Sequence, residues 1–338
     1  MNLKKGYIII IVITGFTLFS CLLGFRTTSE PVQIMATYNK GILSSEDGSS
    51  WDDYNEGLPK NIIPLQIIYD NNKFFYLTTE SSGLFKRSLK DKKWESKNSH
   101  YFKRITQYKH EKKYRRISAF NIDYKNPDNL IIATKHNIFR SINGGTTWEE
   151  ITRKGLSRRN YITALAISGN KIVAGTSFNG IYISYGGKFF RRGRGLPKEP
   201  YSGNMYFTEE IYSLQINPLT KKIYSGSAFG KGIYISNKNG YYWKSMGLSY
   251  SKGSFESIKH IAIYPHEILV ATDSNTFIKT NNNKKWIKSS KRKMSFGSKK
   301  PVCIVTVNKR NKPHYFYYKV RHTIAKNNKA ASKRALYV

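Results

Sequence analysis

Ser141-Ile142-Asn143-Gly144-Gly145-Thr146-Thr147-Trp148 is the segment that says most about the structure of this chain. The Asn143 side chain is able to hydrogen-bond its own backbone, and Gly144 and Gly145 accept the positive φ that a reversing chain needs. We therefore predict a tight hairpin turn that ends in a buried tryptophan.

Variants of this turn recur along the chain. The other copies are Ser44 to Trp51, Ser88 to Trp94, Ser184 to Phe190, Ser236 to Trp243 and Thr280 to Trp286. All five tryptophans of the protein fall in the copies, and the aromatic residues that end successive copies are 43, 54, 42, 53 and 43 residues apart. This spacing is typical of the blades of a β-propeller.

The sequence around each turn predicts a unit of four short strands, apolar at alternating positions. In the fourth copy these strands are Tyr161 to Ser168, Lys171 to Ser177, Gly180 to Ser184 and Lys188 to Arg192. The same order fits Ile117 to Glu150, Ile211 to Ser245 and Ile258 to Lys288.

The two ends of the chain bear on the number of blades. Pro31 to Trp51 supplies only the second strand, the third strand and the turn of a unit, and further strands are predicted at Val302 to Val307, His314 to Val320 and Thr323 to Lys326. Sharing a blade between the two ends would remove exposed sheet edges. We predict an all-β fold, a monomeric β-propeller of four-stranded antiparallel blades over residues 26–330, with seven blades preferred and six as the alternative. Residues 331–338 are either a terminal strand or the start of a missing further unit.

The repeated string resembles the Asp-box, also called the BNR repeat, whose pattern is Ser-x-Asp-x-Gly-x-Thr-Trp. The best copy keeps Ser141, Gly145, Thr147 and Trp148, with Asn143 in the place of Asp. The resemblance implies a β-propeller whose tryptophans pack between blades and do not bind ligand. The positions that carry it are Ser44, Trp51, Trp94, Ser141, Asn143, Gly145, Trp148, Ser236, Gly240, Trp243 and Trp286.

Residues 1–25 have the pattern of an export signal. Lys4 and Lys5 precede an uncharged run from Gly6 to Phe25, and Leu18-Phe19-Ser20-Cys21 resembles a bacterial lipobox, in which Cys21 is acylated after cleavage. The alternatives are an uncleaved membrane anchor, since twenty uncharged residues just span a bilayer, and a simple cleaved signal. Each alternative places the rest of the chain in the bacterial cell envelope, outside the inner membrane. Cys303, between Val302 and Ile304, has the setting of a buried strand thiol.

The chain is strongly basic. Its 57 Lys and Arg residues against 21 Asp and Glu residues give a formal net charge of +36, which is beyond an ordinary surface balance. One alternative is a biased genome that places solvated lysines on every loop. Two clusters favour a specific surface: Lys103, Arg104, Lys112, Lys113, Arg115 and Arg116 in one, and Arg191, Arg192 and Arg194 in the other.

Topology places both clusters on one face of the predicted disc. The longest links between blades, at about Lys97 to Arg115 and Gly193 to Glu209, leave from the face opposite the hairpin turns, which also receives the loops around His136, Phe178 and Phe229. We predict that this face, through the two clusters and these three residues, binds an acidic protein or an anionic glycan or envelope polymer. Nucleic acid is not the expected ligand of an exported chain.

The resemblance includes sialidases and xyloglucan hydrolases, so catalysis must be considered. Arg116-Ile117-Ser118 is a poor substitute for the sialidase Arg-Ile-Pro string, and the sequence marks out no pair of carboxylates at the roughly 5 to 9.5 Å that glycosidases use. No His and Cys spacing indicates a metal site and no Gly-rich loop indicates a phosphate-binding cofactor.

We therefore predict a non-catalytic protein without cofactor or metal. It is similar in this respect to sortilin-type receptors and photosystem II assembly factors, which hold partners. The alternative is the glycan-binding half of a longer or split glycoside hydrolase, sialidase-like or barrel-linked. Ala331 to Val338 favours this alternative, because it resembles the opening strand of a further unit.

Overall fold

The computed structural model describes residues 32–37, 40–45, 50–70, 73–98, 117–134, 137–151, 154–156, 161–202, 205–207, 210–228, 232–248, 257–263, 267–272, 275–280, 285–288, 301–307 and 313–316. Several predictions concern residues outside these ranges. They are the export signal with Cys21, the first cationic cluster, His136, Phe229, and residues 331–338. No helix in the described ranges is long and apolar enough to cross a membrane.

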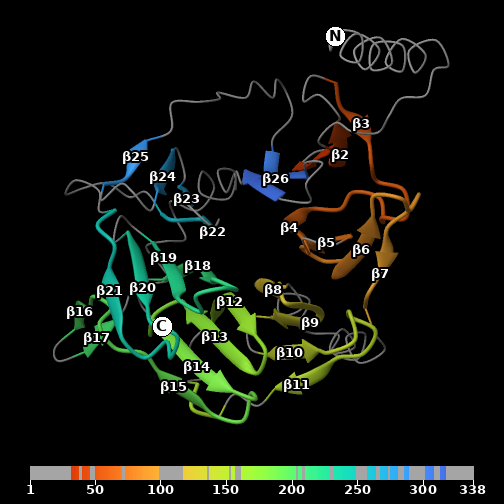
Figure 1. Ribbon diagram of the computed structural model, residues 1–338. Helices are drawn as coiled ribbons and strands as arrows, with labels where there is room; N and C mark the ends of the chain where they lie inside the picture. Colours follow the sequence, from red (N-terminus) through yellow and green to blue (C-terminus); the bar gives the residue numbers. More distant parts are fainter. Residues whose placement is uncertain are drawn as a thin grey trace, which may run out of the picture.

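Apart from one separate two-stranded hairpin, the described strands form six antiparallel sheets around a common centre (Figure 1), so the all-β propeller prediction is confirmed. Five of the sheets are built from four consecutive strands each. In chain order, the first two of these sheets contain β4 (Pro64–Tyr69), β5 (Phe74–Thr79), β6 (Leu84–Ser88) and β7 (Glu95–Ser96), and then β8 (Ala119–Asp123), β9 (Asn126–Ala133), β10 (Ile138–Ser141) and β11 (Glu149–Ile151). The third contains β12 (Ile162–Ser168), β13 (Lys171–Thr176), β14 (Ile181–Tyr185) and β15 (Phe190–Arg192). The last two contain β18 (Ile211–Ile216), β19 (Ile223–Ser227), β20 (Ile233–Ser236) and β21 (Trp243–Ser245), and then β22 (His260–Ile263), β23 (Glu267–Ala271), β24 (Thr276–Thr280) and β25 (Ile287–Lys288). The first strand of each sheet lies nearest the centre, as the contacts of β12 with β8 and β18 show.

The sixth sheet joins both ends of the chain and corrects the preferred blade number. It consists of β1 (Val32–Thr37), β2 (Gly41–Ser45), β3 (Asp52–Asp53), β26 (Pro301–Val307) and β27 (Pro313–Phe316), in the order β27-β26-β1-β2-β3. Met35 pairs with Ile304, and in Figure 1 the blue β26 lies beside the red-brown N-terminal strands. Seven blades is therefore wrong and six is right, because the C-terminal strands complete the first sheet and do not build another.

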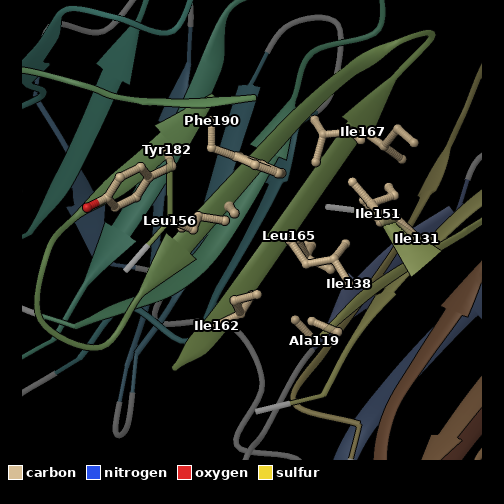
Figure 2. Close-up of a cluster of buried hydrophobic side chains, with 13 residues drawn as sticks. Ala119, Ile131, Ile138, Ile151, Leu156, Ile162, Leu165, Ile167, Tyr182 and Phe190 are labelled. Atoms are coloured by element: carbon tan, nitrogen blue, oxygen red, sulfur yellow. The ribbon is translucent and has the colours of Figure 1, made fainter. Parts of the chain in front are cut away.

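The hydrophobic core lies between neighbouring sheets. Figure 2 shows one such interface, in which Ile131 and Ile138 of one sheet face Ile162 and Leu165 of the next. Another cluster of buried side chains joins Ile34 of the closing sheet to residues of both neighbouring sheets. The packing therefore continues around the whole ring. Burying an aliphatic side chain of this size stabilises the fold by roughly 1.5 to 3 kcal/mol.

The turn at Ser141 closes through its own side chains. Asn143 Oδ1 accepts a 2.9 Å hydrogen bond from the Thr147 N–H, and Ser141 Oγ accepts one of 2.9 Å from the Gly145 N–H. Gly144 and Gly145 have φ of 65° and 87°, in the left-handed region that glycine tolerates. Trp148 then enters the cluster between its own sheet and the preceding one, where it is 6% exposed.

A second repeated feature ties consecutive sheets together. After the fourth strand the chain makes a left-handed turn at a Gly-Leu pair, and the aromatic residue of the next hairpin turn docks on it. The backbone N–H groups of Trp94, Phe190 and Trp243 donate hydrogen bonds of 2.8, 2.8 and 2.9 Å to the carbonyls of Glu56, Lys154 and Arg194, each directly before the glycine. We call this arrangement the inter-blade clasp.

The two faces of the ring carry different connections. The hairpin face carries the turns after the first and third strands, such as 169–170 and 186–189. The loop face carries the loops after the second strand, such as 177–180, and the links from one sheet to the next.

Candidate binding surfaces

A ring of β-bulges surrounds the centre on the loop face. The pairing of innermost strands with their neighbours shifts register at Leu65, Thr163 and Tyr212, so each of these residues is the extra residue of a bulge. Ser118 and Lys259 hold the same position in their own sheets. The Ser118 N–H donates to the carbonyl of Ala133, which already pairs with Ala119, and the Lys259 N–H donates to the carbonyl of Ala271, which already pairs with His260. In the closing sheet the shift falls at Val302. A bulge turns its extra residue out of the ladder, here toward the central channel.

Five of the bulge residues border a central pocket of about 230 Å³. Leu65, Ser118, Thr163, Tyr212 and Lys259 all line it, and the pocket continues along the innermost strands to residues such as Asn121 and Gln215. Other polar lining residues are Gln66, Thr78, Glu210, Ser213 and His260. The pocket therefore presents both donors and acceptors to a ligand.

Hydrogen bonds between neighbouring sheets fix several of these side chains. Thr163 Oγ1 donates to the Ile211 carbonyl at 2.6 Å, and Asn121 Nδ2 donates to the Leu165 carbonyl at 2.9 Å. The Lys259 side chain is only 8% exposed, and its Nζ lies 3.8 Å from the centre of the Tyr212 ring, where the ring face attracts a cation. Among the described lining residues Glu210 is the single carboxylate.

A second pocket, of about 410 Å³, lies where the sheet β12–β15 passes into the following link. Its walls come from the loop between β13 and β14 and from the chain after β15. The lining residues are Asn179, Gly180, Arg192, Gly193, Arg194, Gly195, Leu196 and Lys198. We call it the rim pocket; its three charged lining residues are all cations.

The structure brings together part of the second predicted cluster. Arg192 pairs with Tyr182 and Arg191 with Ile183, so the two arginines point to opposite sides of β15. Arg192 and Arg194 line the rim pocket, whereas Arg191 is not among its lining residues. Phe178 is 53% exposed and lies in the same loop as Asn179.

The long link after β15 contains a separate hairpin, β16 (Glu199–Ser202) and β17 (Met205–Phe207), that forms its own two-stranded sheet. In Figure 1 it is drawn at the outer side of the ring, away from the centre. The rim pocket lies at the start of the same link.

Sequence reasoning missed the clasp and the bulge ring. The clasp had a visible signal, because Gly-Leu recurs after the fourth strand at 57–58, 155–156, 195–196 and 247–248. The bulge ring had none, since Leu65, Ser118, Thr163, Tyr212 and Lys259 share no chemical property. Only the register of the strands identifies them as equivalent.

Acidic, histidine and cysteine side chains do not gather into a metal site in the described ranges, where no group of three or more is placed to hold an ion.

Comparison with known proteins shows the fold. No family model matches the chain, and no curated protein matches it. Among solved structures, it is similar to the extracellular domain of a protein described as a hybrid two-component system from B. thetaiotaomicron. The TM-score is 0.56 at 14% identity, over 87% of this chain and 38% of that one.

It is also similar to a GH74 xyloglucanase from Xanthomonas campestris. The TM-score is 0.50 at 13% identity, over 76% of this chain and 47% of the enzyme. The chain thus spans less than half the length of either structure.

Proposed function

We propose that this chain is a non-catalytic Asp-box propeller of the bacterial cell envelope that binds an acidic protein or an anionic glycan or envelope polymer. The observation that carries the proposal is the rim pocket, which is lined by Arg192, Arg194 and Lys198 and by no carboxylate among the described residues. The binding surface includes the loop cluster of Lys103, Arg104, Lys112, Lys113, Arg115 and Arg116, together with His136, Phe178 and Phe229.

The chemistry of the rim pocket suits carboxylate or sulfate groups. Arginine offers a planar set of donors that binds an oxyanion through two hydrogen bonds at once, and lysine adds a point charge. Gly193 and Gly195 also line the pocket, but Trp243 fills the space beside each of them, so the three cationic side chains supply the binding groups. The net charge of +36 adds long-range attraction to any polyanion.

The central pocket supports a binding function more than a catalytic one. Hydrolysis of a glycosidic bond by the usual route requires two carboxyl groups on either side of the bond. Within the described part of the chain the pocket offers one, Glu210.

The alternative function is the glycan-binding half of a longer or split glycoside hydrolase. One observation favours it: the amides and hydroxyls of the central pocket, including Gln66, Asn121 and Gln215, are groups that hydrogen-bond sugar hydroxyls. The chain also covers less than half of a xyloglucanase with a similar fold.

Binding to defined polyanions tests the main proposal. Affinity for poly-L-glutamate and for alginate is measured at low and high salt, and we expect it to fall steeply with salt because exposed charges are screened within about 8 to 10 Å at physiological ionic strength. The double variant Arg192→Gln/Arg194→Gln should bind at least tenfold more weakly. Arg191→Gln is the matched control, since this arginine points to the other side of β15.

Two results would contradict the proposal. One is binding that does not depend on salt, and the other is an equal loss of affinity in the Arg191→Gln control. Release of reducing sugar from a glycan by the purified chain would favour the hydrolase alternative.

The proposed attachment to the membrane depends on Cys21. Mass spectrometry of the membrane fraction should find this residue acylated at a new N-terminus. An unmodified Cys21 within an intact N-terminus would leave the uncleaved anchor.

A further inference from the structure

Three lysines converge on the hairpin face, where the sheet β12–β15 meets the sheet β18–β21. Lys171 begins β13, Lys221 lies in the turn between β18 and β19, and Lys238 lies in the hairpin turn between β20 and β21. Lys171 and Lys221 are partly buried and Lys238 is exposed. None of the three belongs to a cluster that the sequence marked out.

Hydrogen bonds hold two of these side chains in place, those of Lys171 and Lys221. Lys171 Nζ donates to the backbone carbonyl of Lys238, and Lys221 Nζ donates to Ser168 Oγ at 3.0 Å. Ser168 pairs with Lys171 across the hairpin between β12 and β13, so the Lys221 amine is held beside the strand partner of Lys171, while the Lys171 amine reaches the turn between β20 and β21. The lysines are therefore positioned groups at a junction between sheets.

The backbone at Lys221 is strained. Its φ of 61° lies in the left-handed region, and among the described residues only Asn61 shares this conformation without being glycine. This conformation is unfavourable for a residue with a Cβ. Such strain persists where the surrounding structure requires it, and it is often associated with function. Here it accompanies the contact of Lys221 with Ser168.

The charges at this junction are unbalanced. Burial, followed by the positive charges of Lys221 and Lys238, lowers the pKa of Lys171 from its ordinary value. Arg140 reaches the same turn from the other side, since its Nη2 donates to the Gly169 carbonyl at 3.2 Å. Within the described ranges none of the three lysines forms an ion pair with a carboxylate.

One carboxylate, Asp123, lies beneath the turn, but donors already surround it. It is 4% exposed and accepts hydrogen bonds from the N–H groups of Gly169 and Lys125 and from Asn129 Nδ2. These hydrogen bonds stabilise its charge, and in the described ranges it forms no ion pair with Lys171, Lys221 or Lys238.

We propose that Lys171, Lys221 and Lys238 form a binding site for a multiply charged oxyanion, a phosphate or sulfate group, on the hairpin face. Each ammonium group has three N–H donors, so the three side chains retain donors for a ligand beyond the hydrogen bonds described above. A dianion bound between the three ammonium groups offsets the repulsion among their positive charges. The site lies on the opposite face from the rim pocket and does not depend on the function proposed there.

Equilibrium dialysis of the full-length protein against inorganic phosphate and sulfate tests the site. The ionic strength is kept constant with sodium chloride, so that general screening is the same in every sample. We expect saturable binding that Lys171→Gln/Lys221→Gln weakens at least tenfold. The single variant Lys238→Gln, which changes only an exposed side chain, should weaken it severalfold without disturbing the fold.

Lys125→Gln is the control, because Lys125 is an exposed lysine in the equivalent turn of another sheet. It should leave the affinity within twofold of the wild type. If polyphosphate displaces bound phosphate at a lower concentration of phosphoryl groups, the natural ligand is a polymer that carries this group. If polyphosphate does not displace it, the ligand is the free ion. Either result upholds the site. Phosphate and sulfate binding no tighter than chloride, or an equal loss in the Lys125→Gln control, would overturn it.

Discussion

Arg194 and Trp243 are joined through their main chains: the N–H of Trp243 donates a 2.9 Å hydrogen bond to the Arg194 carbonyl. Arg194 in turn donates its N–H to the Tyr241 carbonyl at 2.7 Å. The backbone of this arginine therefore belongs to the clasp between two sheets, while its side chain lines the rim pocket. The candidate binding surface therefore shares its backbone with the inter-blade clasp, a contact that recurs around the ring.

The clasp predicts that Gly195→Ala destabilises the protein by more than the strain of its conformation. Gly195 has a φ of 90°, and a Cβ there would overlap the carbonyl oxygen of Trp243. Gly247→Ala is the matched control, because Gly247 has a similar φ of 78° but no atom of the described residues lies within 4 Å of an added Cβ. Urea denaturation should show a loss of about 1 to 2 kcal/mol for Gly247→Ala and a clearly larger loss for Gly195→Ala. Equal losses of stability in the two variants would mean that the clasp shifts to make room for the added Cβ at position 195.

Trp148→Ala should lower the free energy of unfolding by about 3 to 5 kcal/mol, as truncation of a large buried side chain does. Trp148 is 6% exposed and its Nε1 donates to the Lys97 carbonyl of the preceding sheet at 3.1 Å. Ile142→Ala, at a 70% exposed position in the same turn, should change stability by less than about 0.5 kcal/mol. An unchanged melting temperature for Trp148→Ala would assign the indole to ligand binding.

Tyr76→Phe should leave the protein as stable as the wild type at neutral pH, or more stable by about 1 kcal/mol. The Tyr76 hydroxyl is buried and has no hydrogen-bond partner among the described residues, so its removal takes away an unsatisfied group. A loss of more than about 1 kcal/mol at neutral pH would reveal a partner for this hydroxyl.

The same variant changes the response to alkali. Burial, with smaller contributions from Asp70 and Asp128, raises the pKa of Tyr76 well above 10.0. Above pH 10 the unfolded chain loses this proton while the folded chain keeps it, so wild-type stability falls as the pH rises through that range. Denaturation between pH 9 and 11 should show a shallower fall for Tyr76→Phe. Identical slopes would contradict the pKa shift.

Sequence reasoning reached the fold because the information is local and repeated. Each hairpin turn carries its own glycines and ends in its own aromatic residue, and the spacing of the copies sets the size of a blade. The same reasoning overcounted the blades, because the strands after residue 300 look like another unit. Only the pairing of Met35 with Ile304 shows that they complete the first sheet.

The candidate sites were predicted less completely, since they depend on register and on contacts between sheets. Successive side chains of β15 point to opposite sides of the strand, so Arg191 and Arg192 are separated although they are adjacent in sequence. Lys171, Lys221 and Lys238 are far apart along the chain and meet only through the packing of two sheets. A charge cluster that forms in this way leaves no signal in the sequence.

The closing sheet makes the order of synthesis matter. β1 and β2 emerge from the ribosome first, yet β1 obtains its second partner, β26, only when nearly the whole chain has been made. Until then its unpaired edge is a template for association with other chains. Contacts between residues so distant in sequence also form slowly. A nascent chain therefore has to be protected at this edge for longer than at any of the five sheets made from consecutive strands.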